Sequence, residues 1–220
     1  MEAIFAAIMK DEQQLRRVLQ TAPDAHRSQS PEDLLIDAIP HWLYAGDVPL
    51  HLAAAALKPG VVEILLAHGA DPNARNRRAA TPLHYACDAR PGLGGVWNPA
   101  AQRALIQLLV AHGSLLDPAD RGGATPLHRA VRARSPSAVH QLLALGASPD
   151  CRLRSRGSTP LHLAAQSTGA SGTAESLEAQ LEIIALFREL GADLGARDDD
   201  QRTAYERATN PRVRSALSPR

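Results

Sequence analysis

Aromatic residues and cysteine are scarce in this sequence. Only 3% of its 220 residues are Phe, Trp or Tyr while 45% are hydrophobic, so Ala and Leu must supply most of a core. The two cysteines, Cys87 and Cys151, are too few for a disulfide framework and favour a reducing compartment. Cys87 falls in an Ala-rich helical stretch, where we expect a buried and inert thiol. No apolar run has the length of a membrane span.

The chain also lacks an excess of charge of either sign. The 24 Lys and Arg are balanced by 23 Asp and Glu, and the net charge of +1 argues against a nucleic-acid or membrane surface as partner. The basic side chains are almost all arginine, since the chain has only two lysines. Residues 1–10 have neither the basic start nor the cleavage site of a signal peptide, so we expect a cytoplasmic protein.

The sequence does contain a tetrapeptide that recurs. Val-Pro-Leu-His occupies 48–51, and Thr-Pro-Leu-His occupies 81–84, 125–128 and 159–162. Successive prolines are 33, 44 and 34 residues apart, and a degraded copy, Thr-Ala-Tyr-Glu, starts at Thr203. A period in the low thirties indicates stacked structural repeats. The two long intervals then indicate insertions of 44−33=11 residues each.

Each copy has the residues of a helix start. Thr is a good N-cap, and Pro fits the first helical position because its missing N–H is not needed there. A second apolar helix follows in each repeat and ends at a glycine, which suits a left-handed C-terminal stop. These glycines are Gly69, Gly113 and Gly146. The predicted unit is therefore helix–turn–helix–loop.

The copy from Leu50 to Ala74, with Leu-His-Leu-Ala-Ala and Val-Val-Glu-Ile-Leu-Leu-Ala-His-Gly-Ala-Asp-Pro-Asn-Ala, resembles the ankyrin-repeat family. The resemblance extends over residues 41–210. It implies an all-α ankyrin-repeat solenoid of about six helix pairs, with finger-like β-turn loops and insertions between the helices of some pairs. It also implies a non-catalytic protein–protein interaction scaffold that binds its partner through the concave face and the finger loops.

The repeats divide a single ankyrin-repeat domain, residues 1–220, into successive segments. We expect an N-terminal capping repeat at 1–22, an extra helix and loop at 23–47, repeats at 48–80, 81–124, 125–158 and 159–202, and a C-terminal capping repeat and tail at 203–220.

Three segments depart from the repeat. The run from Ser30 to Asp33 has a cap, a proline and two acidic groups, which predicts a helix of about two turns ending before Pro40. The insertions at 88–99 and 166–178 are expected to be loops, because the first is rich in Gly and Pro and the second in Ser, Thr, Gly and Ala. Arg188 stands at an apolar position of the last second helix, so we expect its head to reach water.

The positions that the family uses to contact partners are rich in arginine. Residues 131–160 carry five Arg and one Asp, and the finger that follows is acidic at Asp198–Asp200. One interpretation is an ordinary solvated surface. The other is a basic groove that docks an acidic segment of a partner protein through Arg–carboxylate pairs. The candidate arginines are Arg77, Arg78, Arg121, Arg132, Arg154 and Arg156.

Three aromatic residues are further candidates for partner binding. Trp42 and Tyr44 either pack on the extra helix or anchor a partner, since both residue types are enriched in interface hot spots. Trp97, in the first insertion, is either folded back as a plug or offered to a partner.

Four of the nine histidines belong to the tetrapeptide, namely His51, His84, His128 and His162. We expect these rings to bond the preceding Thr and neighbouring backbone. Stacked neighbours lie about 10 Å apart, too far to share one zinc ion. The sequence also lacks Cys-x-x-Cys, His-Glu-x-x-His, Gly-x-Ser-x-Gly and a phosphate-binding Gly-Lys-Ser/Thr. We therefore expect no enzyme activity, no cofactor and no metal.

The alternative function is an electrostatic binder of an acidic ligand or nucleic acid through the arginine-rich middle fingers. The small net charge and the acidic finger argue against nucleic acid. An enzyme with its site in the inserted loops ranks last, because those loops offer no evident base or metal cluster. We expect a monomer with a protein partner and no membrane association.

Overall fold

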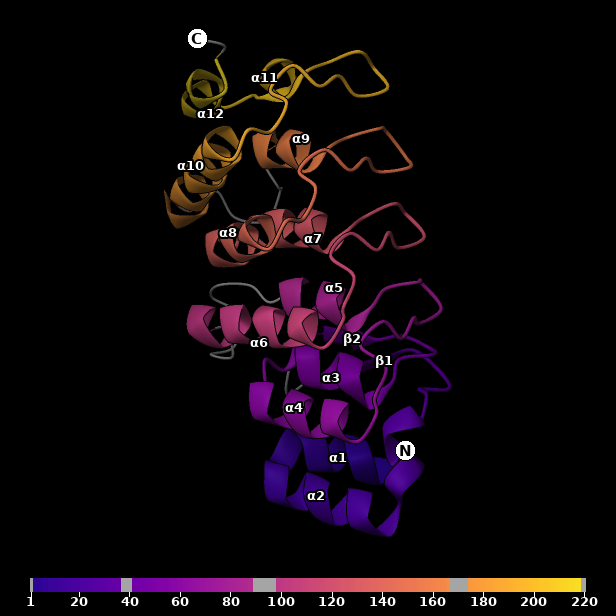
Figure 1. The fold of residues 1–220 in the computed structure, drawn as a ribbon. Coiled ribbons are helices and arrows are strands. Elements are labelled where there is room, and N and C mark those ends of the chain that lie inside the picture. Colours follow the sequence, from indigo (N-terminus) through magenta and orange to yellow (C-terminus); the bar gives the residue numbers. More distant parts are fainter. Residues whose placement is uncertain (1, 37–40, 89–97, 167–173, 219–220) are drawn as a thin grey trace.

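The predicted repeats form a stack of helix pairs in a computed structural model of the protein, which describes residues 2–36, 41–88, 98–166 and 174–218. Figure 1 shows the pairs following one another from the N-terminus to the C-terminus, with loops projecting from one side. The described residues form six pairs, so the prediction of an all-α solenoid is confirmed. The helices are α1 Glu2–Lys10, α2 Glu12–Thr21, α3 Pro49–Ala55, α4 Pro59–Ala67, α5 Pro82–Asp88, α6 Pro99–Ala111, α7 Pro126–Arg132, α8 Pro136–Ala144, α9 Pro160–Ala165, α10 Ala174–Glu189, α11 Ala204–Arg207 and α12 Pro211–Ala216.

The helices form two layers. The first helices, α3, α5, α7, α9 and α11, pack against one another beside the projecting loops, and α4, α6, α8 and α10 form the outer layer. Short side chains at one position let the first helices approach closely, namely the fully buried Ala53, Ala86, Ala130 and Ala164. Cys87 is buried in the same layer, and this burial raises the pKa of its thiol.

The helix predicted after Ser30 does not form, and this prediction is wrong. Residues 23–47 instead contain a short 3-10 helix, Pro23–Arg27, and an antiparallel hairpin of β1 Leu34–Ile36 with β2 His41–Leu43. The hairpin pairs Leu35 with Trp42, so Trp42 has no extra helix to pack on.

Long-range contacts explain why the local helix signal fails. The Ser30 backbone bonds across to Gly46 and Asp47, each at 2.8 Å, which holds the chain extended. The Asp33 carboxylate, expected in the first turn of a helix, accepts the Ala45 N–H at 2.9 Å and pairs with Arg77. These partners lie up to 44 residues away and outweigh the cap residues.

The first insertion, predicted as a loop at 88–99, falls between α5 and α6, but Asp88 is still part of α5 and Pro99 already starts α6. Its residues 89–97, with Trp97, lie outside the described part of the chain. The second insertion is shorter than the predicted 166–178, because α10 already begins at Ala174. The segment from Ala174 is rich in Ala, Glu and Leu, which are strong helix formers.

A buried glutamine closes the base of each insertion. The Gln102 side chain donates to the Ala86 carbonyl at 2.9 Å, and the Gln180 side chain donates to the Ala164 carbonyl at 2.6 Å. In both repeats the glutamine lies 16 residues after its acceptor, at the end of the first helix. The two insertion repeats therefore share one device for satisfying helix-end carbonyls.

Arg188 has a role that the sequence analysis missed. Its guanidinium is half-buried and donates to the carbonyls of Ala216, at 2.6 Å, and Ser218, at 3.1 Å. The charge therefore sits at the C-terminal end of α12, where a cation is favourable, rather than in bulk water as predicted.

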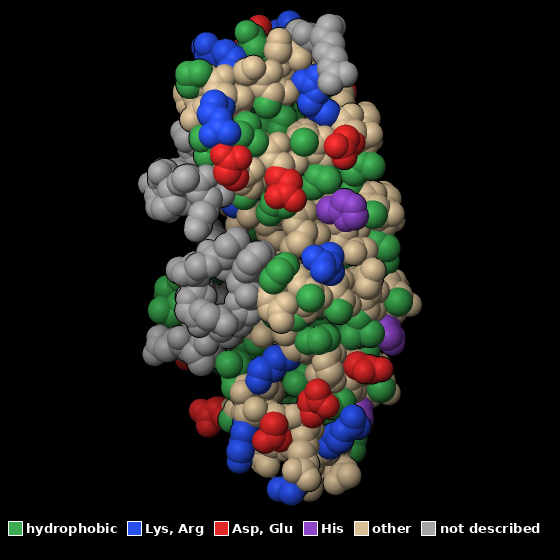
Figure 2. Space-filling view, turned by 90° about the vertical axis from the view of Figure 1, so that its left-hand side faces the viewer, with side chains coloured by type: hydrophobic (Ala, Val, Ile, Leu, Met, Phe, Trp, Pro, Cys, Tyr) green, Lys and Arg blue, Asp and Glu red, His purple; other side chains and the backbone are tan. Residues whose placement is uncertain are grey.

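The surface turned away from the loops carries charges of both signs. Figure 2 shows acidic and basic side chains interspersed on this face, with hydrophobic side chains between them. No helix in the described ranges is long and apolar enough to cross a membrane.

Candidate partner-binding site

Four finger-like loops beside the first helices are built on one plan. In each, the N–H of the first residue bonds the carbonyl of the last, in the fingers 76–80, 120–124, 153–158 and 198–202. Three fingers start with Asn or Asp, whose side chain accepts further amides of the same turn. Asn and Asp favour such turns for this reason. The 153–158 finger differs, since it starts with Leu153 and is one residue longer.

The first finger is hydrogen-bonded to the loop that follows β2, and each later finger is hydrogen-bonded to the one before it. The donors are the amides of Arg77, Arg121, Arg154 and Asp199, and the acceptors are the carbonyls of Ala45, Arg78, Gly122 and Arg156, all at 2.9 Å. This ladder holds the fingers in a fixed row, and the side chains that they carry are positioned before any partner arrives.

The repeated histidines connect each first helix to the following finger. In His84, Nδ1 accepts the Thr81 N–H at 3.1 Å, so Nε2 carries the proton and donates to the Ala124 carbonyl at 3.0 Å. The rings of His51, His128 and His162 make the equivalent contacts. Burial lowers the pKa of His84, with a smaller effect of Arg129, to about 4. Burial also lowers the pKa of His128 to about 4, so the rings of His84 and His128 are neutral structural links.

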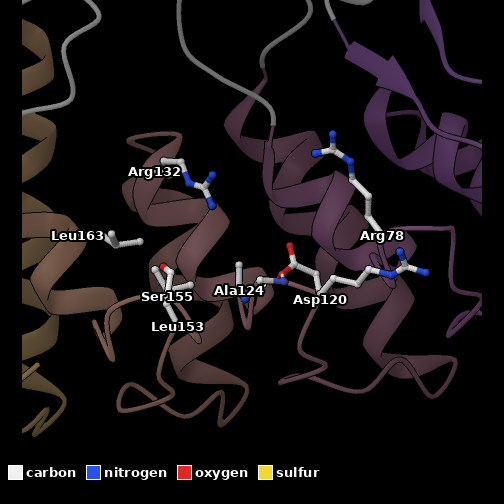
Figure 3. A pocket seen from close by; sticks show the side chains of 9 residues that line it. Arg78, Asp120, Ala124, Arg132, Leu153, Ser155 and Leu163 are labelled. Atoms are coloured by element: carbon white, nitrogen blue, oxygen red, sulfur yellow. Dashed lines mark hydrogen bonds between the residues drawn. The ribbon is translucent and has the colours of Figure 1, made fainter. Parts of the chain in front are cut away.

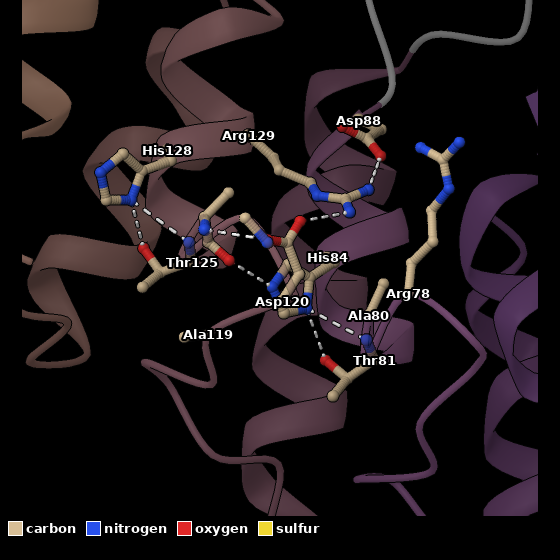
Figure 4. Close-up of polar contacts among 12 residues, drawn as sticks. Arg78, Ala80, Thr81, His84, Asp88, Ala119, Asp120, Thr125, His128 and Arg129 are labelled. Atoms are coloured by element: carbon tan, nitrogen blue, oxygen red, sulfur yellow. Dashed lines mark hydrogen bonds and ion pairs between the residues drawn. The ribbon is translucent and has the colours of Figure 1, made fainter. Parts of the chain in front are cut away.

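A buried ion pair lies between the fingers and the first helices (Figure 4). Arg129, on α7, bonds Asp88 at 2.5 Å and Asp120 at 3.0 Å. Burial alone would lower the pKa of Arg129, but the attraction of both carboxylates raises it. Burial would likewise raise the pKa of Asp120, yet hydrogen bonds from Arg129 and Ala124 hold it below its usual range. The Asp120 charge is thus only partly compensated, because Arg129 shares its single positive charge between two carboxylates.

Beside this pair lies a hollow of about 590 Å³, shown in Figure 3. Its lining is formed by residues from three fingers and from the first helices α7 and α9: Arg78, Asp120, Arg121, Gly122, Ala124, Arg132, Leu153, Ser155 and Leu163. In the described part of the chain, Arg78, Arg121 and Arg132 have no carboxylate within salt-bridge distance. The hollow therefore carries uncompensated positive charge.

Arg78 and Tyr44 are brought together at the N-terminal end of the hollow. The Arg78 guanidinium carbon lies 4.0 Å from the centre of the Tyr44 ring, a cation–π contact that fixes the head of the arginine. Tyr44 itself is half-buried. Its role is thus to support an arginine of the hollow.

The other candidates are more scattered. Arg77 is neutralised by Asp33 of the hairpin, and Trp42 is half-exposed on β2, outside the lining of the hollow. Arg154 and Arg156 are exposed on the 153–158 finger but do not line the hollow.

Some charges counted in the sequence analysis are not available to a partner. Arg134 is buried and donates to the carbonyls of Ala164 and Gln166. In the acidic finger, Arg207 pairs with both Asp198 and Asp200, so two of its three carboxylates are already engaged within the protein. The sequence analysis also did not single out Leu153 and Leu163. A signal was available, because the 153–158 finger starts with Leu where the other three start with Asn or Asp.

The architecture is that of a helical-repeat solenoid with a row of fingers. Within the described ranges, no group of three or more His, Cys, Asp or Glu side chains is arranged to hold a metal ion. A family model described as ankyrin repeats (3 copies) matches residues 100–198, and one described as ankyrin repeat matches residues 45–77. The chain belongs to the ankyrin-repeat family.

Curated relatives match over a short stretch. NF-kappa-B inhibitor alpha of Rattus norvegicus is 52% identical over 40 residues, which cover 18% of this chain and 13% of the relative. The Homo sapiens protein of the same name is 50% identical over 40 residues, with the same coverage. The match thus spans little more than one repeat, and together with the family it supports a protein–protein interaction scaffold.

Proposed function

We propose that this protein is a non-catalytic interaction scaffold that captures an acidic segment of a partner protein in the hollow between its fingers and first helices. One observation carries the proposal: Arg78, Arg121 and Arg132 all line the hollow, and within the described part of the chain none of them has a carboxylate at salt-bridge distance. Arginine matches a carboxylate with two parallel N–H donors, so such a cluster favours an acidic ligand.

The surroundings make this cluster suitable for binding. Tyr44 supports Arg78, and the backbone ladder through the Arg121 N–H fixes the finger that carries Arg121. A site that is rigid before binding loses little conformational entropy when its partner arrives. Asp120, the one carboxylate among the described residues of the lining, is paired with Arg129, and three arginines of the lining outnumber it.

A labelled synthetic peptide of about twelve residues, rich in Glu, is long enough to cross several fingers, since it spans roughly 40 Å when extended. We expect it to bind the whole protein in a fluorescence anisotropy titration and to weaken as salt is raised. A peptide with Gln in place of each Glu should bind at least about tenfold more weakly.

Charge reversal locates the site. Arg121→Glu and Arg132→Glu should each weaken binding of the Glu peptide about tenfold or more, because attraction becomes repulsion. The matched control is Arg103→Glu, an exposed arginine on the outer helix α6, and it should leave binding unchanged. Equal effects of all three variants, or no binding of the Glu peptide, would overturn the proposal. A single-stranded oligonucleotide that binds as tightly as the peptide would favour the nucleic-acid alternative.

A further inference from the structure

Two residues occupy equivalent positions in each of four repeats. One is the first residue of the finger, and the other is the first-helix residue three positions after the helix-starting position of the tetrapeptide. We call this place the pair position. Three of the four pairs are joined by a polar contact: Asn76 with Tyr85 at 3.0 Å, Asp120 with Arg129 at 3.0 Å, and Asp198 with Arg207 at 2.6 Å.

The fourth pair is apolar. It consists of Leu153, at the start of the longer finger, and Leu163 on α9. Both side chains are half-buried, and both line the hollow (Figure 3). By contrast, Asp120 and Arg129 on one side, and Asp198 and Arg207 on the other, leave at most 14% of a side chain exposed. The row of closed polar pairs is thus interrupted by one open apolar position.

With leucine at both residues, this repeat lacks the polar contact that the equivalent pairs make in the other three repeats. Apolar side chains left half-exposed at the wall of a hollow gain most from a ligand that covers them. Carboxylates would be poorly placed against two leucines, because they would lose water without gaining a donor. Arg121 and Arg132, which line the same hollow, supply such donors.

From this juxtaposition we infer that the acidic segment carries an aliphatic side chain, seated on Leu153 and Leu163, with carboxylates beside it that reach Arg121 and Arg132. The inference rests on the proposed function and narrows its ligand to an acidic peptide with an embedded aliphatic residue. The acidic groups provide long-range attraction, and the aliphatic residue sets the register of the peptide in the groove.

The experiment compares two Glu-rich peptides of about twelve residues that differ only at one central position, Leu or Ala. The Leu peptide should bind the whole protein about tenfold more tightly, the effect of covering a buried aliphatic side chain rather than a methyl group. Leu153→Ser and Leu163→Ala should each reduce this preference to about twofold or less, while the salt dependence of binding persists. Leu115→Ala, at an exposed leucine outside the hollow, should keep the full preference.

The outcomes separate the two ideas. Glu peptides that bind equally well with Leu or Ala, but still respond to Arg121→Glu, would overturn the apolar seat and leave the proposed function intact. A preference that survives both Leu153→Ser and Leu163→Ala would also overturn it. If no Glu peptide bound the wild-type protein, the proposed function itself would be overturned. Circular dichroism of each variant confirms that the comparison is made between folded proteins, and Leu153→Ser serves where Leu163→Ala does not fold.

Discussion

Replacing Gly123 with Ala should destabilise the protein by about 3 kcal/mol, whereas the same change at Gly69 should cost about 1 kcal/mol. Both glycines have a left-handed backbone, with φ of +82° and +83°. A non-glycine residue there costs roughly 1–2 kcal/mol, part of which is offset because Gly→Ala also restricts the unfolded chain. This shared strain accounts for the whole effect at Gly69, where an added Cβ meets no atom within 4 Å.

Gly123 differs because its backbone lies in close contact with the start of the next finger, 153–158. A Cβ at this position would stand 2.6 Å from the Arg154 amide nitrogen and 2.9 Å from its Cγ. The substitution would push the fingers apart and break the 2.9 Å hydrogen bond from the Arg154 N–H to the Gly122 carbonyl. Overpacking and the lost bond together add about 2 kcal/mol.

Urea unfolding of the wild-type protein and of both variants measures their free energies of unfolding. In thermal unfolding, the Tm of the two variants should differ by roughly 4–8 °C. Gly123→Ala should also weaken capture of the Glu peptide, because it displaces the finger that carries Arg121, whereas Gly69→Ala should not. Equal losses of stability in the two variants would refute the reasoning, since they would mean that the fingers are not in close backbone contact.

Three further predictions concern the scaffold. Burial lowers the pKa of His84 and His128 to about 4 from 6.5, so the unfolded chain binds more protons between these values. The free energy of unfolding should therefore fall as pH drops from 6.5 to 4, by roughly 3 kcal/mol per ring, and a flat series of urea unfolding curves would contradict this. Gln102→Leu should cost about 2 kcal/mol through an unsatisfied helix-end carbonyl, while Gln107→Leu on the exposed side should change stability by less than about 0.5 kcal/mol. Ala79→Gly should stabilise by about 0.5 kcal/mol, measured in the same way, because Ala79 has a φ of +58°.

The repeated part of the fold was predictable because its signal is written once per repeat. The Pro-Leu-His copies give the first helices, and the glycines after the second helices give their ends. The hairpin was not predictable from the same rules. The run from Ser30 to Asp33 has the local residues of a helix start. Contacts with residues 45–47 and with Arg77, which a linear pattern does not show, decide against it.

The candidate site was predictable in composition but not in detail. The sequence places arginines on the fingers, yet which of them remain uncompensated depends on partners distant along the chain. Arg77 is neutralised by Asp33, 44 residues away, whereas Arg78 next to it is supported by Tyr44 and left without a carboxylate. The pairing of Arg129 with Asp88 likewise spans 41 residues.

The contacts that shape the scaffold and those that distinguish one repeat from another belong to different atoms. The rings of the repeated histidines and the ladder between fingers use backbone donors and acceptors, so they hold whatever side chains the fingers carry. The side chains at the pair position take no part in these backbone links. The position holds an amide with a phenol in one repeat, an ion pair in two repeats and two leucines in the fourth. The histidine link and the ladder persist at all four pairs, even at the leucine pair, whose finger is one residue longer. The leucine pair beside uncompensated arginines is therefore the place where selection of a ligand should act.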